Sequence, residues 1–277
     1  MIIDAHHHFW KYTAAEYGWI SPQMSVLRRD FLPGDLLAET QSAGVDGVVS
    51  VQARQTLEET GWLLDLAEQE EFAGLIRGVV GWVPLISPDI DADLERFAGR
   101  PKLRGVRHVL QDEPAEFMLR DDFNRGVGRL HRLGLRYDIL IFERQLPAAI
   151  ELVDRHPNQV FVLDHVAKPR IREGIVLPWR QRMLELGRRP NVYCKISGMV
   201  TEADHQAWAV EQLEPYLQTA LEAFGPGRLM IGSDWPVCLL ACDYRRWIGI
   251  VGDFAARLSA AERKRLLSET AIEAYGL

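Results

Sequence analysis

Cysteine is scarce in this chain, and the few cysteines present do not form a recognisable pair. Only 3 of the 277 residues are cysteines. Cys194 lies in an apolar stretch that predicts a strand, and Cys238 with Cys242 lacks the spacing of a structural zinc site. An odd number of unpaired cysteines is typical of reduced thiols, so we expect a cytoplasmic protein without disulfides.

Long apolar runs and an excess of basic residues are also absent. No apolar segment approaches the ~20 residues that span a bilayer, and the first residues lack the pattern of a signal peptide. The net charge is −7 and the pI is about 5.7, which argues against nucleic acid or a membrane surface as a partner. We therefore expect neither nucleic acid nor a membrane as a partner, and the sequence leaves the oligomeric state open.

No linker or low-complexity tract interrupts the chain, so we expect one domain over residues 1–277. Short β-rich segments recur, and most are followed by an amphipathic helix, which predicts βα units and a parallel sheet. Several are continuous apolar runs, as expected of strands that are buried on both faces. The eight predicted strands are Ile2–Ala5, Gly47–Ala53, Ile76–Val83, Leu103–Leu110, Arg136–Phe142, Val160–Val166, Val192–Ser197 and Leu229–Ser233.

Polar residues near the ends of these strands follow one another at nearly regular intervals, most of them about 30 residues. A βα unit of this size, counted eight times in one domain, favours an α/β fold of the (β/α)8 or TIM-barrel type over an open sheet. The polar residues are His8, Gln52, Trp82, His108, Asp138, His165, Lys195 and Asp234.

Helix signals agree with this alternation. Pro33 and Gly44 bracket a predicted helix, with proline at its start and glycine after its end. Thr56 with Glu59, and Ser259 with Glu262, fit the capping box at a helix start. Helical residues are also expected from His205 to Phe224.

Residues 9–32 form a long connection between the first strand and its helix. A connection of this length is typical of an active-site lid or a binding loop. The alternative is that its aromatic side chains simply cover one end of the barrel. These side chains are Trp10, Tyr12, Tyr17, Trp19 and Phe31.

The histidine pair His6 and His8 lies at the end of the first predicted strand. Because side chains alternate along a strand, these two imidazoles point to the same face, whereas His7 points away and is predicted to be structural. A purification tag would be longer than three histidines and would not continue from an apolar strand. His-x-His is common by chance, so its meaning depends on partners elsewhere in the chain.

A barrel would bring such partners to the pair, because barrel enzymes place their chemistry at the C-terminal ends of the strands. Imidazoles and a carboxylate are suitable ligands for a divalent metal, zinc in particular, and the carboxylate could instead act as a general base. The residues at these ends are His108, Asp164-His165, Lys195 and Asp234.

Alternation leaves two choices open at these strand ends. Only one of Arg107 and His108 is expected to face the pocket. Asp164 and His165 can both face it only if the strand has already ended. Lys195 lies inside an apolar strand, where an unpaired charge is uncommon, and this favours a functional role.

Four short motifs surround these candidate residues. They are Asp4-Ala5-His6-His7-His8, Leu163-Asp164-His165-Val166-Ala167-Lys168-Pro169, Cys194-Lys195-Ile196-Ser197-Gly198 and Gly232-Ser233-Asp234-Trp235-Pro236. In this combination they resemble the amidohydrolase superfamily, and more narrowly its branch of lactone hydrolases. The likeness extends over essentially the whole chain. It implies a hydrolase that opens the ring ester of a sugar-acid lactone of the L-fucono or L-rhamnono type.

The resemblance also implies roles for individual residues. It implies that His6, His8, His165 and Asp234 form the catalytic cluster and hold a metal ion, with Asp234 activating water as the general base. Lys195 joins Asp234 and His165 as an expected catalytic residue, because it could stabilise the developing oxyanion. Contacts with substrate hydroxyls are expected from Arg54, His108, Tyr137 and Trp235.

The chain departs from the binuclear members of the superfamily. Those members use a histidine on the fifth strand and a bridging lysine or carboxylate on the fourth. Here the fifth strand contains Arg136-Tyr137-Asp138-Ile139-Leu140, without histidine, and no fourth-strand lysine reaches the expected place. We therefore expect at most one divalent ion, zinc first, and a metal that can be dispensable.

Two other functions compete with lactone hydrolysis. A non-hydrolytic decarboxylase or hydratase of the same superfamily should keep a metal and the fifth-strand histidine that this chain lacks. A catalytically silent metal-binding protein has no need of Asp234 and Lys195, which are both present.

Overall fold

All eight predicted strands form, and each pairs in parallel with the next strand along the chain. The computed structural model describes residues 1–277. Strands β1 and β8 meet where the His8 N–H donates to Trp235 O and the Asp234 N–H donates to His6 O, each at 2.7 Å. This arrangement confirms the (β/α)8 barrel. The strands are β1 Ile3–His7, β2 Gly47–Val51, β3 Ile76–Gly81, β4 Leu103–His108, β5 Arg136–Ile139, β6 Phe161–Leu163, β7 Val192–Ile196 and β8 Leu229–Ile231.

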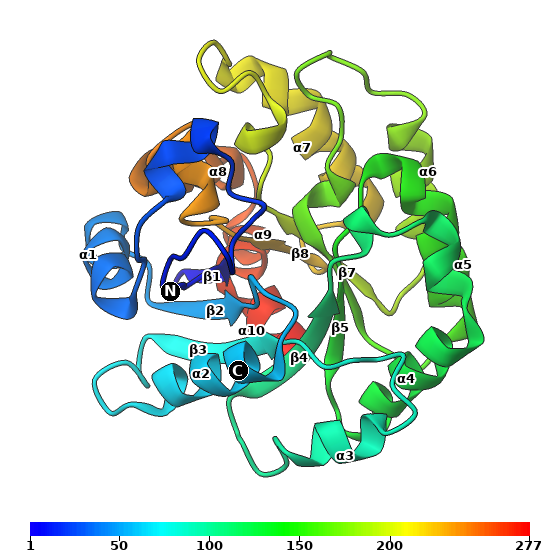
Figure 1. The fold of residues 1–277 in the computed structure, drawn as a ribbon. Coiled ribbons are helices and arrows are strands. Elements are labelled where there is room, and N and C mark those ends of the chain that lie inside the picture. The colour runs from blue at the N-terminus through cyan, green and yellow to red at the C-terminus, as the bar shows by residue number, and fades with distance from the viewer.

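Helices form a ring outside the strands (Figure 1). Between the sheet and this ring lies the main apolar core, to which every strand except β1 and most helices contribute. The helices are α1 Pro33–Ala43, α2 Leu57–Glu68, α3 Ile90–Glu95, α4 Asp121–Arg132, α5 Leu146–Arg155, α6 Trp179–Leu186, α7 Val210–Phe224, α8 Tyr244–Ala256, α9 Ala260–Lys264 and α10 Thr270–Tyr275.

The predicted helix ends are largely confirmed. Gly44 ends α1 in the left-handed conformation, with φ of 69°. Ser259 and Glu262 form the predicted capping box. At α2 only half of the box is present, because Thr56 accepts from the Glu59 N–H while the Glu59 carboxylate turns to another loop. The prediction of helix from His205 was wrong at its start, since α7 begins at Val210.

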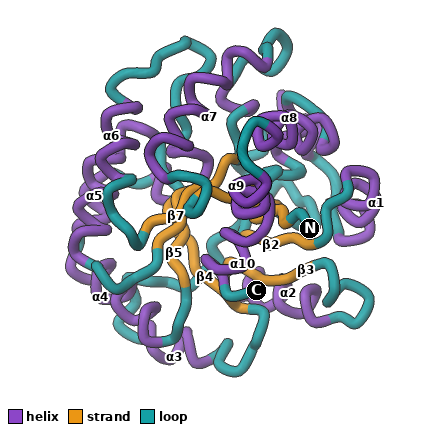
Figure 2. The backbone as a smooth tube through the Cα atoms, turned by 180° about the vertical axis from the view of Figure 1, so that it is seen from behind, coloured by secondary structure: helices purple, strands orange, loops and turns teal.

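The C-terminal helices cover one end of the barrel. Viewed from behind, α9 and α10 lie across the strands, and the chain ends beside them (Figure 2). Ala271, Ala274 and Tyr275 pack with inward-facing strand residues in a second, smaller apolar cluster. This cluster fills the N-terminal end of the barrel and leaves the opposite end for the site.

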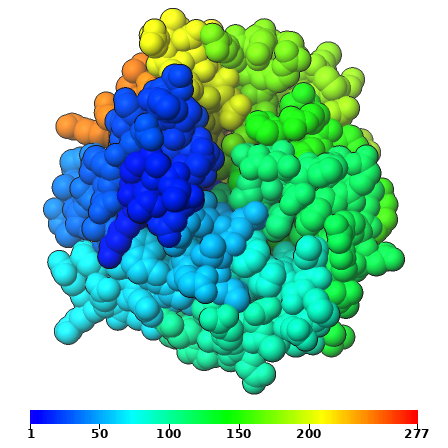
Figure 3. Space-filling model, viewed as in Figure 1, coloured from blue at the N-terminus to red at the C-terminus, as the bar shows by residue number.

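The segment 9–32 lies at that opposite end. A bridge pairs Trp10 with Phe31, and a short 3-10 helix spans Pro22–Leu27. In the space-filling view this dark blue segment stands beside a hollow, with green residues across from it (Figure 3). None of the helices is long and apolar enough to cross a membrane. All three cysteines are free, as predicted.

Candidate active site

A cleft of about 710 Å³ opens at the C-terminal ends of the strands. His8, His165 and Asp234 lie along it, and Glu16 and Trp19 of the 9–32 segment line its rim. The segment therefore borders the cleft, in addition to packing its buried aromatic residues over the barrel end.

Strand β1 presents its histidines as alternation predicts. His6 and His8 point inward, and their Nε2 atoms lie 3.3 Å apart. His7 points to the other face, where its Nε2 lies 2.9 Å from the Ser50 hydroxyl. His7 is completely buried and structural, as predicted.

Asp164 and His165 both face the interior, because strand β6 ends at Leu163. The four residues 165–168 then have positive φ, with values of 53°, 46°, 60° and 47°. Left-handed backbone costs about 1–2 kcal/mol per non-glycine residue, and such strain is retained mainly where function requires the geometry. The turn aims the His165 ring at Asp234, with its Nδ1 2.9 Å from Ser197 Oγ.

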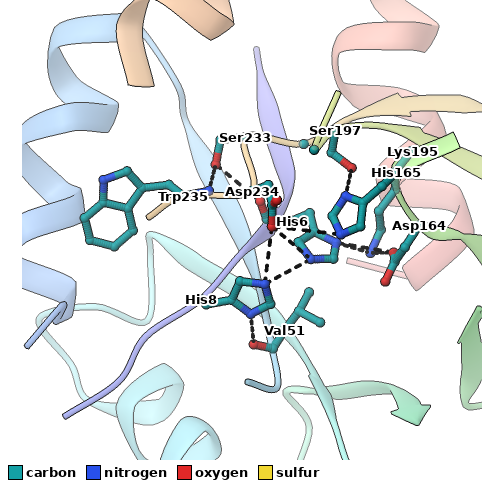
Figure 4. Close-up of polar contacts among 12 residues, drawn as sticks. His6, His8, Val51, Asp164, His165, Lys195, Ser197, Ser233, Asp234 and Trp235 are labelled. Carbon is teal, nitrogen blue, oxygen red and sulfur yellow. Dashed lines mark hydrogen bonds and ion pairs between the residues drawn. The ribbon is translucent and has the colours of Figure 1, made fainter. Parts of the chain in front are cut away.

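The three imidazoles converge on one carboxylate oxygen (Figure 4). Asp234 Oδ1 lies 3.4 Å from His8 Nε2, 3.8 Å from His6 Nε2 and 3.9 Å from His165 Nε2. Four ligand atoms around a tetrahedral zinc ion with bonds of about 2.0–2.1 Å lie roughly 3.3–3.4 Å from one another. The separations among His6, His8 and Asp234 are close to this value, whereas His165 lies 3.9 Å from Asp234 Oδ1 and falls in a second possible group with His6 and Asp164.

Polar partners at the far side of the rings let the inward nitrogens face such an ion. His8 Nδ1 must donate to Val51 O at 2.8 Å, because a carbonyl only accepts. His6 Nδ1 lies 3.3 Å from Asp164 Oδ1. The unprotonated His8 Nε2 and the Asp234 oxygen repel one another at 3.4 Å unless a proton or a cation lies between them. His6 Nε2 faces the same space and also lies 3.3 Å from Arg107 Nη1. The residues present therefore fit a single divalent metal ion.

Burial controls the protonation of this cluster. Burial lowers the pKa of His6 well below its ordinary value and lowers the pKa of His165 to about 4. For Asp234, burial alone would raise the pKa, but His165 and His8 outweigh it and hold the pKa below its ordinary value. At neutral pH His6 and His165 are thus neutral imidazoles, which can ligate, and Asp234 is ionised and can accept a proton.

A layer of buried charges supports the cluster from below. Lys195 is completely buried, with its Nζ 2.6 Å from Asp138 Oδ2, 3.0 Å from Asp164 Oδ1 and 3.2 Å from His6 Nδ1. The Tyr275 hydroxyl donates to the same Asp138 oxygen at 2.6 Å. Lys195 does not reach the cleft, so the prediction that it contacts the oxyanion directly needs correction: it acts on the cluster through Asp164 and His6.

Arg107, not His108, faces the barrel interior. Its Nη1 lies 3.0 Å from Asp164 Oδ2 and 3.3 Å from His6 Nε2, and the side chain lines the cleft. His108 points outward, where it stacks on Phe117 and bonds to Glu113. The expected substrate contact of His108 is thereby corrected.

The other three expected substrate contacts divide in the same way. Arg54 lines the cleft and pairs with Glu16 across its rim. Tyr137 is completely buried and packs edge-on against Phe123 of α4. The next residue along β5, Asp138, faces the barrel interior instead. The Trp235 ring points away from Asp234, into the aromatic residues that surround Phe31 (Figure 4). Tyr137 and Trp235 are therefore too far outside the cleft to meet a substrate.

Sequence reasoning missed several residues of the site. Asp138 was noted as a polar residue at a strand end, yet its pairing with Lys195 was not anticipated. Gln52, also at a strand end, binds the Arg107 guanidinium through its side-chain oxygen at 2.6 Å. Both could have been identified by asking which strand-end residues neutralise a buried charge, since a buried charge needs a partner.

The comparisons with known proteins agree with this site and fold. A family model described as amidohydrolase matches residues 3–277. The chain belongs to the amidohydrolase family. An L-fucono-1,5-lactonase from Burkholderia multivorans is 44% identical over 99% of this chain and 96% of the relative. A second L-fucono-1,5-lactonase, from Burkholderia ambifaria, is 38% identical over 94% of this chain and 87% of the relative.

A solved amidohydrolase structure from Burkholderia multivorans contains zinc. It superposes on this chain with a TM-score of 0.95 at 44% identity, and the alignment covers 100% of this chain and 99% of the other. In the present amidohydrolase, two overlapping groups of histidine and aspartate residues could hold a metal ion: His6, His8 and Asp234, and His6, Asp164 and His165.

Proposed function

We propose that this amidohydrolase is a lactonase that hydrolyses the ring ester of a sugar-acid lactone, L-fucono-1,5-lactone first. The observation that carries the proposal is the convergence of three buried imidazoles on the ionised Asp234 at the floor of a polar cleft. Two lactonase relatives, 44% and 38% identical to the chain, support this substrate class.

Asp234 is the general base in this proposal. Its carboxylate accepts a proton as a water oxygen attacks the lactone carbonyl carbon, and with zinc bound at Oδ1 this role would fall to Oδ2. When the bond between that carbon and the ring oxygen breaks, Asp234 returns the proton to the leaving oxygen. The products are a carboxylic acid, which ionises, and a free hydroxyl on the same sugar chain.

The oxyanion that develops on the carbonyl needs a nearby cation. Arg107 is suited to this role, because its guanidinium lines the cleft beside His6 and is fixed by Asp164 and Gln52. A zinc ion, held by His6, His8, His165 and Asp234, would supply Lewis-acid polarisation of the carbonyl. An ester carbonyl needs less activation than an amide, so one ion would suffice. A second ion is not needed to neutralise Asp164 and Asp138, because Arg107 and Lys195 already balance their charges.

Arg54 and the 9–32 segment complete the proposed substrate site. Arg54 bonds to Glu16 of that segment and reaches the cleft, so it can contact the sugar and hold the rim in place. We further propose that the segment closes over the sugar ring. The cytoplasmic location stays a prediction, supported by three free cysteines.

A decarboxylase of the same superfamily is the alternative enzyme. β5 contains no histidine, and the high-identity relatives are lactonases, so the observations favour hydrolysis. A dihydroxybenzoic acid decarboxylase from Polaromonas matches the fold with a TM-score of 0.71 at 14% identity, which shows the shared fold alone.

A panel of sugar lactones with a pH indicator tests the proposal. We expect acid release from at least one lactone, fastest with L-fucono-1,5-lactone, above the uncatalysed rate. Parallel assays with a chelator, together with elemental analysis of the purified protein, determine whether zinc is bound and needed. No acid release from any lactone, with or without added zinc, would contradict the proposal.

A further inference from the structure

Two half-buried charged side chains that line the cleft have no partner in the protein. Glu202 follows strand β7 in a short 3-10 helix, Val200–Glu202, and its carboxylate has no hydrogen bond or ion pair. Lys168 ends the left-handed turn, and its Nζ lies 5.4 Å from the centre of the Phe142 ring without any ion-pair partner. By contrast, Arg54 and Arg107 in the same cleft are both paired.

These two side chains lie where the cleft continues into a second cavity. The side cavity measures about 810 Å³ and is lined mainly by polar residues. It shares Lys168, Thr201, Glu202 and His205 with the catalytic cleft. Asp234, Lys168 and Glu202 line the same cleft, so a ring whose carbonyl lies at Asp234 can be oriented toward this shared wall.

The shared wall is electrostatically connected to the catalytic carboxylate. Burial raises the pKa of Glu202, the charge of Asp234 adds to this effect, and Lys168 opposes it. Lys168 also helps to lower the pKa of Asp234. Glu202, Lys168 and Asp234 also line one cleft, so the geometry places all three within reach of one bound molecule.

A left-handed backbone at Lys168 requires an explanation. Residues other than glycine rarely adopt this conformation, and a charge that only faces solvent does not require it. The turn brings His165 and Lys168 to the same cleft, because residues three apart in such a turn share a face. The strain is accounted for if both side chains have to meet one bound molecule.

We propose that Glu202 and Lys168 recognise the ring hydroxyls of the sugar lactone. The Glu202 carboxylate accepts hydrogen bonds from hydroxyls on adjacent ring carbons, and the Lys168 ammonium donates to a hydroxyl oxygen of the same ring. This specificity site rests on the proposed lactonase function. It identifies the residues that would make the enzyme prefer hydroxylated lactone rings over unsubstituted ones.

The test compares two lactones with the same six-membered ring. L-fucono-1,5-lactone carries hydroxyls, whereas δ-valerolactone carries none. Hydrogen bonds to a charged group contribute about 1.5–3 kcal/mol, so Glu202→Gln and Lys168→Met should each lower kcat/KM for the sugar lactone by roughly 10- to 100-fold. At neutral pH, where Asp234 stays ionised in every variant, the kcat/KM for δ-valerolactone should change by less than about 2-fold, which also shows that the variants fold.

Glu173→Gln is the matched control. Glu173 lines the side cavity but not the cleft, and it pairs with Arg170 at 3.8 Å. This variant should keep both rates. Inhibition by L-fuconate, the hydroxylated acid product, gives a readout that needs no second substrate. Its inhibition constant should rise about 10-fold or more in Glu202→Gln and stay unchanged in Glu173→Gln.

Three results would overturn the inference, and they are distinguishable. If Glu202→Gln leaves both the sugar-lactone kcat/KM and the fuconate inhibition constant unchanged, Glu202 does not recognise the hydroxyls, and the proposed lactonase function still stands. An equal loss on both lactones assigns Glu202 to the chemistry or to the fold instead. A wild-type protein that opens neither lactone refutes the proposed function, and the specificity site falls with it.

Discussion

The Lys195 ammonium group is completely buried inside the barrel, where it lies between Asp138 and Asp164. Removing one partner of a buried ion pair leaves an uncompensated charge, which costs about 3–5 kcal/mol. We therefore predict that Lys195→Met lowers the free energy of unfolding by this amount in urea titrations. Lys264→Met is the control, because Lys264 is 70% exposed in its pair with Glu269 and its loss should cost less than about 1 kcal/mol. Equal stabilities of the two variants would contradict the buried network.

Glu59 is a buried carboxyl whose titration should be visible in protein stability. Burial raises the pKa of Glu59 from 4.5 to about 7, although the Ala53 and Arg54 N–H groups donate to it. The native protein therefore binds more protons than the unfolded chain between these two values. Stability contributed by this group is fully present below pH 4.5 and is lost as the pH rises to about 7.

Glu59→Gln should flatten this pH dependence, because the amide oxygen keeps both hydrogen bonds and does not titrate. The shift of about 2.5 pKa units corresponds to roughly 3 kcal/mol. We predict that the difference in unfolding free energy between wild type and Glu59→Gln changes by this amount across the window. A difference that stays constant with pH would show that Glu59 does not titrate there.

The choice between Arg107 and His108 shows what the sequence leaves open at the scale of a residue. The strand itself was predictable, and so was the fact that only one of the two faces inward. Which one faces inward depends on register against β5, where Arg107 lies opposite Asp138. No local pattern encodes this register, but the buried acids Asp138 and Asp164 would have favoured the arginine, because a buried carboxylate needs a cation.

The left-handed turn after β6 positions His165. Gly198 leaves room for the His165 ring because it has no side chain. Gly198 has φ of 60°, and a Cβ there would lie 2.6 Å from His165 Nδ1. We predict that Gly198→Ala displaces the imidazole and lowers kcat by about 100-fold, since an error of about 1 Å in catalytic geometry has this effect. The measurement is kcat for sugar-lactone hydrolysis.

Gly174→Ala separates this steric effect from backbone strain. Gly174 has φ of 65°, but a Cβ there meets no atom within 4 Å. Both variants should lose about 1–2 kcal/mol of stability to the left-handed backbone. Only Gly198→Ala should lose activity, and comparable activity of the two variants would show that the ring can move without consequence.

The same turn marks the limit of prediction at the scale of an element. Strand and helix identities followed from apolar runs and capping residues, and all eight strands were found. The left-handed stretch of His165, Val166, Ala167 and Lys168 was not predictable, because none of these residues favours positive φ. Tertiary packing imposes this conformation. The sequence alone could therefore say only that Asp164 and His165 both face inward if the strand ends before them.

At the scale of the whole molecule, the C-terminus is connected to the site through the barrel interior. Tyr275 of α10 donates to Asp138, which holds Lys195, which in turn contacts His6. Sequence periodicity gave the barrel and the end at which the site lies. It did not give this connection, which joins residues 137 positions apart along the chain.

Tyr275→Phe tests this connection. The variant removes a charge-assisted hydrogen bond to a buried carboxylate, so we predict a loss of about 1.5–3 kcal/mol in unfolding free energy. Tyr193→Phe is matched to it, because the Tyr193 hydroxyl bonds at 3.0 Å to the exposed Glu273. That control should lose less than about 0.5 kcal/mol. A larger loss in the control than in Tyr275→Phe would place the stabilising contact elsewhere.

The central claim is that Asp234 is the base of a sugar lactonase. The direct measurement is the initial rate of acid release from L-fucono-1,5-lactone by wild type and by Asp234→Asn, with circular dichroism to confirm that both are folded. We predict clear acid release by the wild type and a loss of about 10²–10⁴-fold in kcat for Asp234→Asn, the usual contribution of a general base. A folded Asp234→Asn variant with near wild-type kcat would contradict the claim.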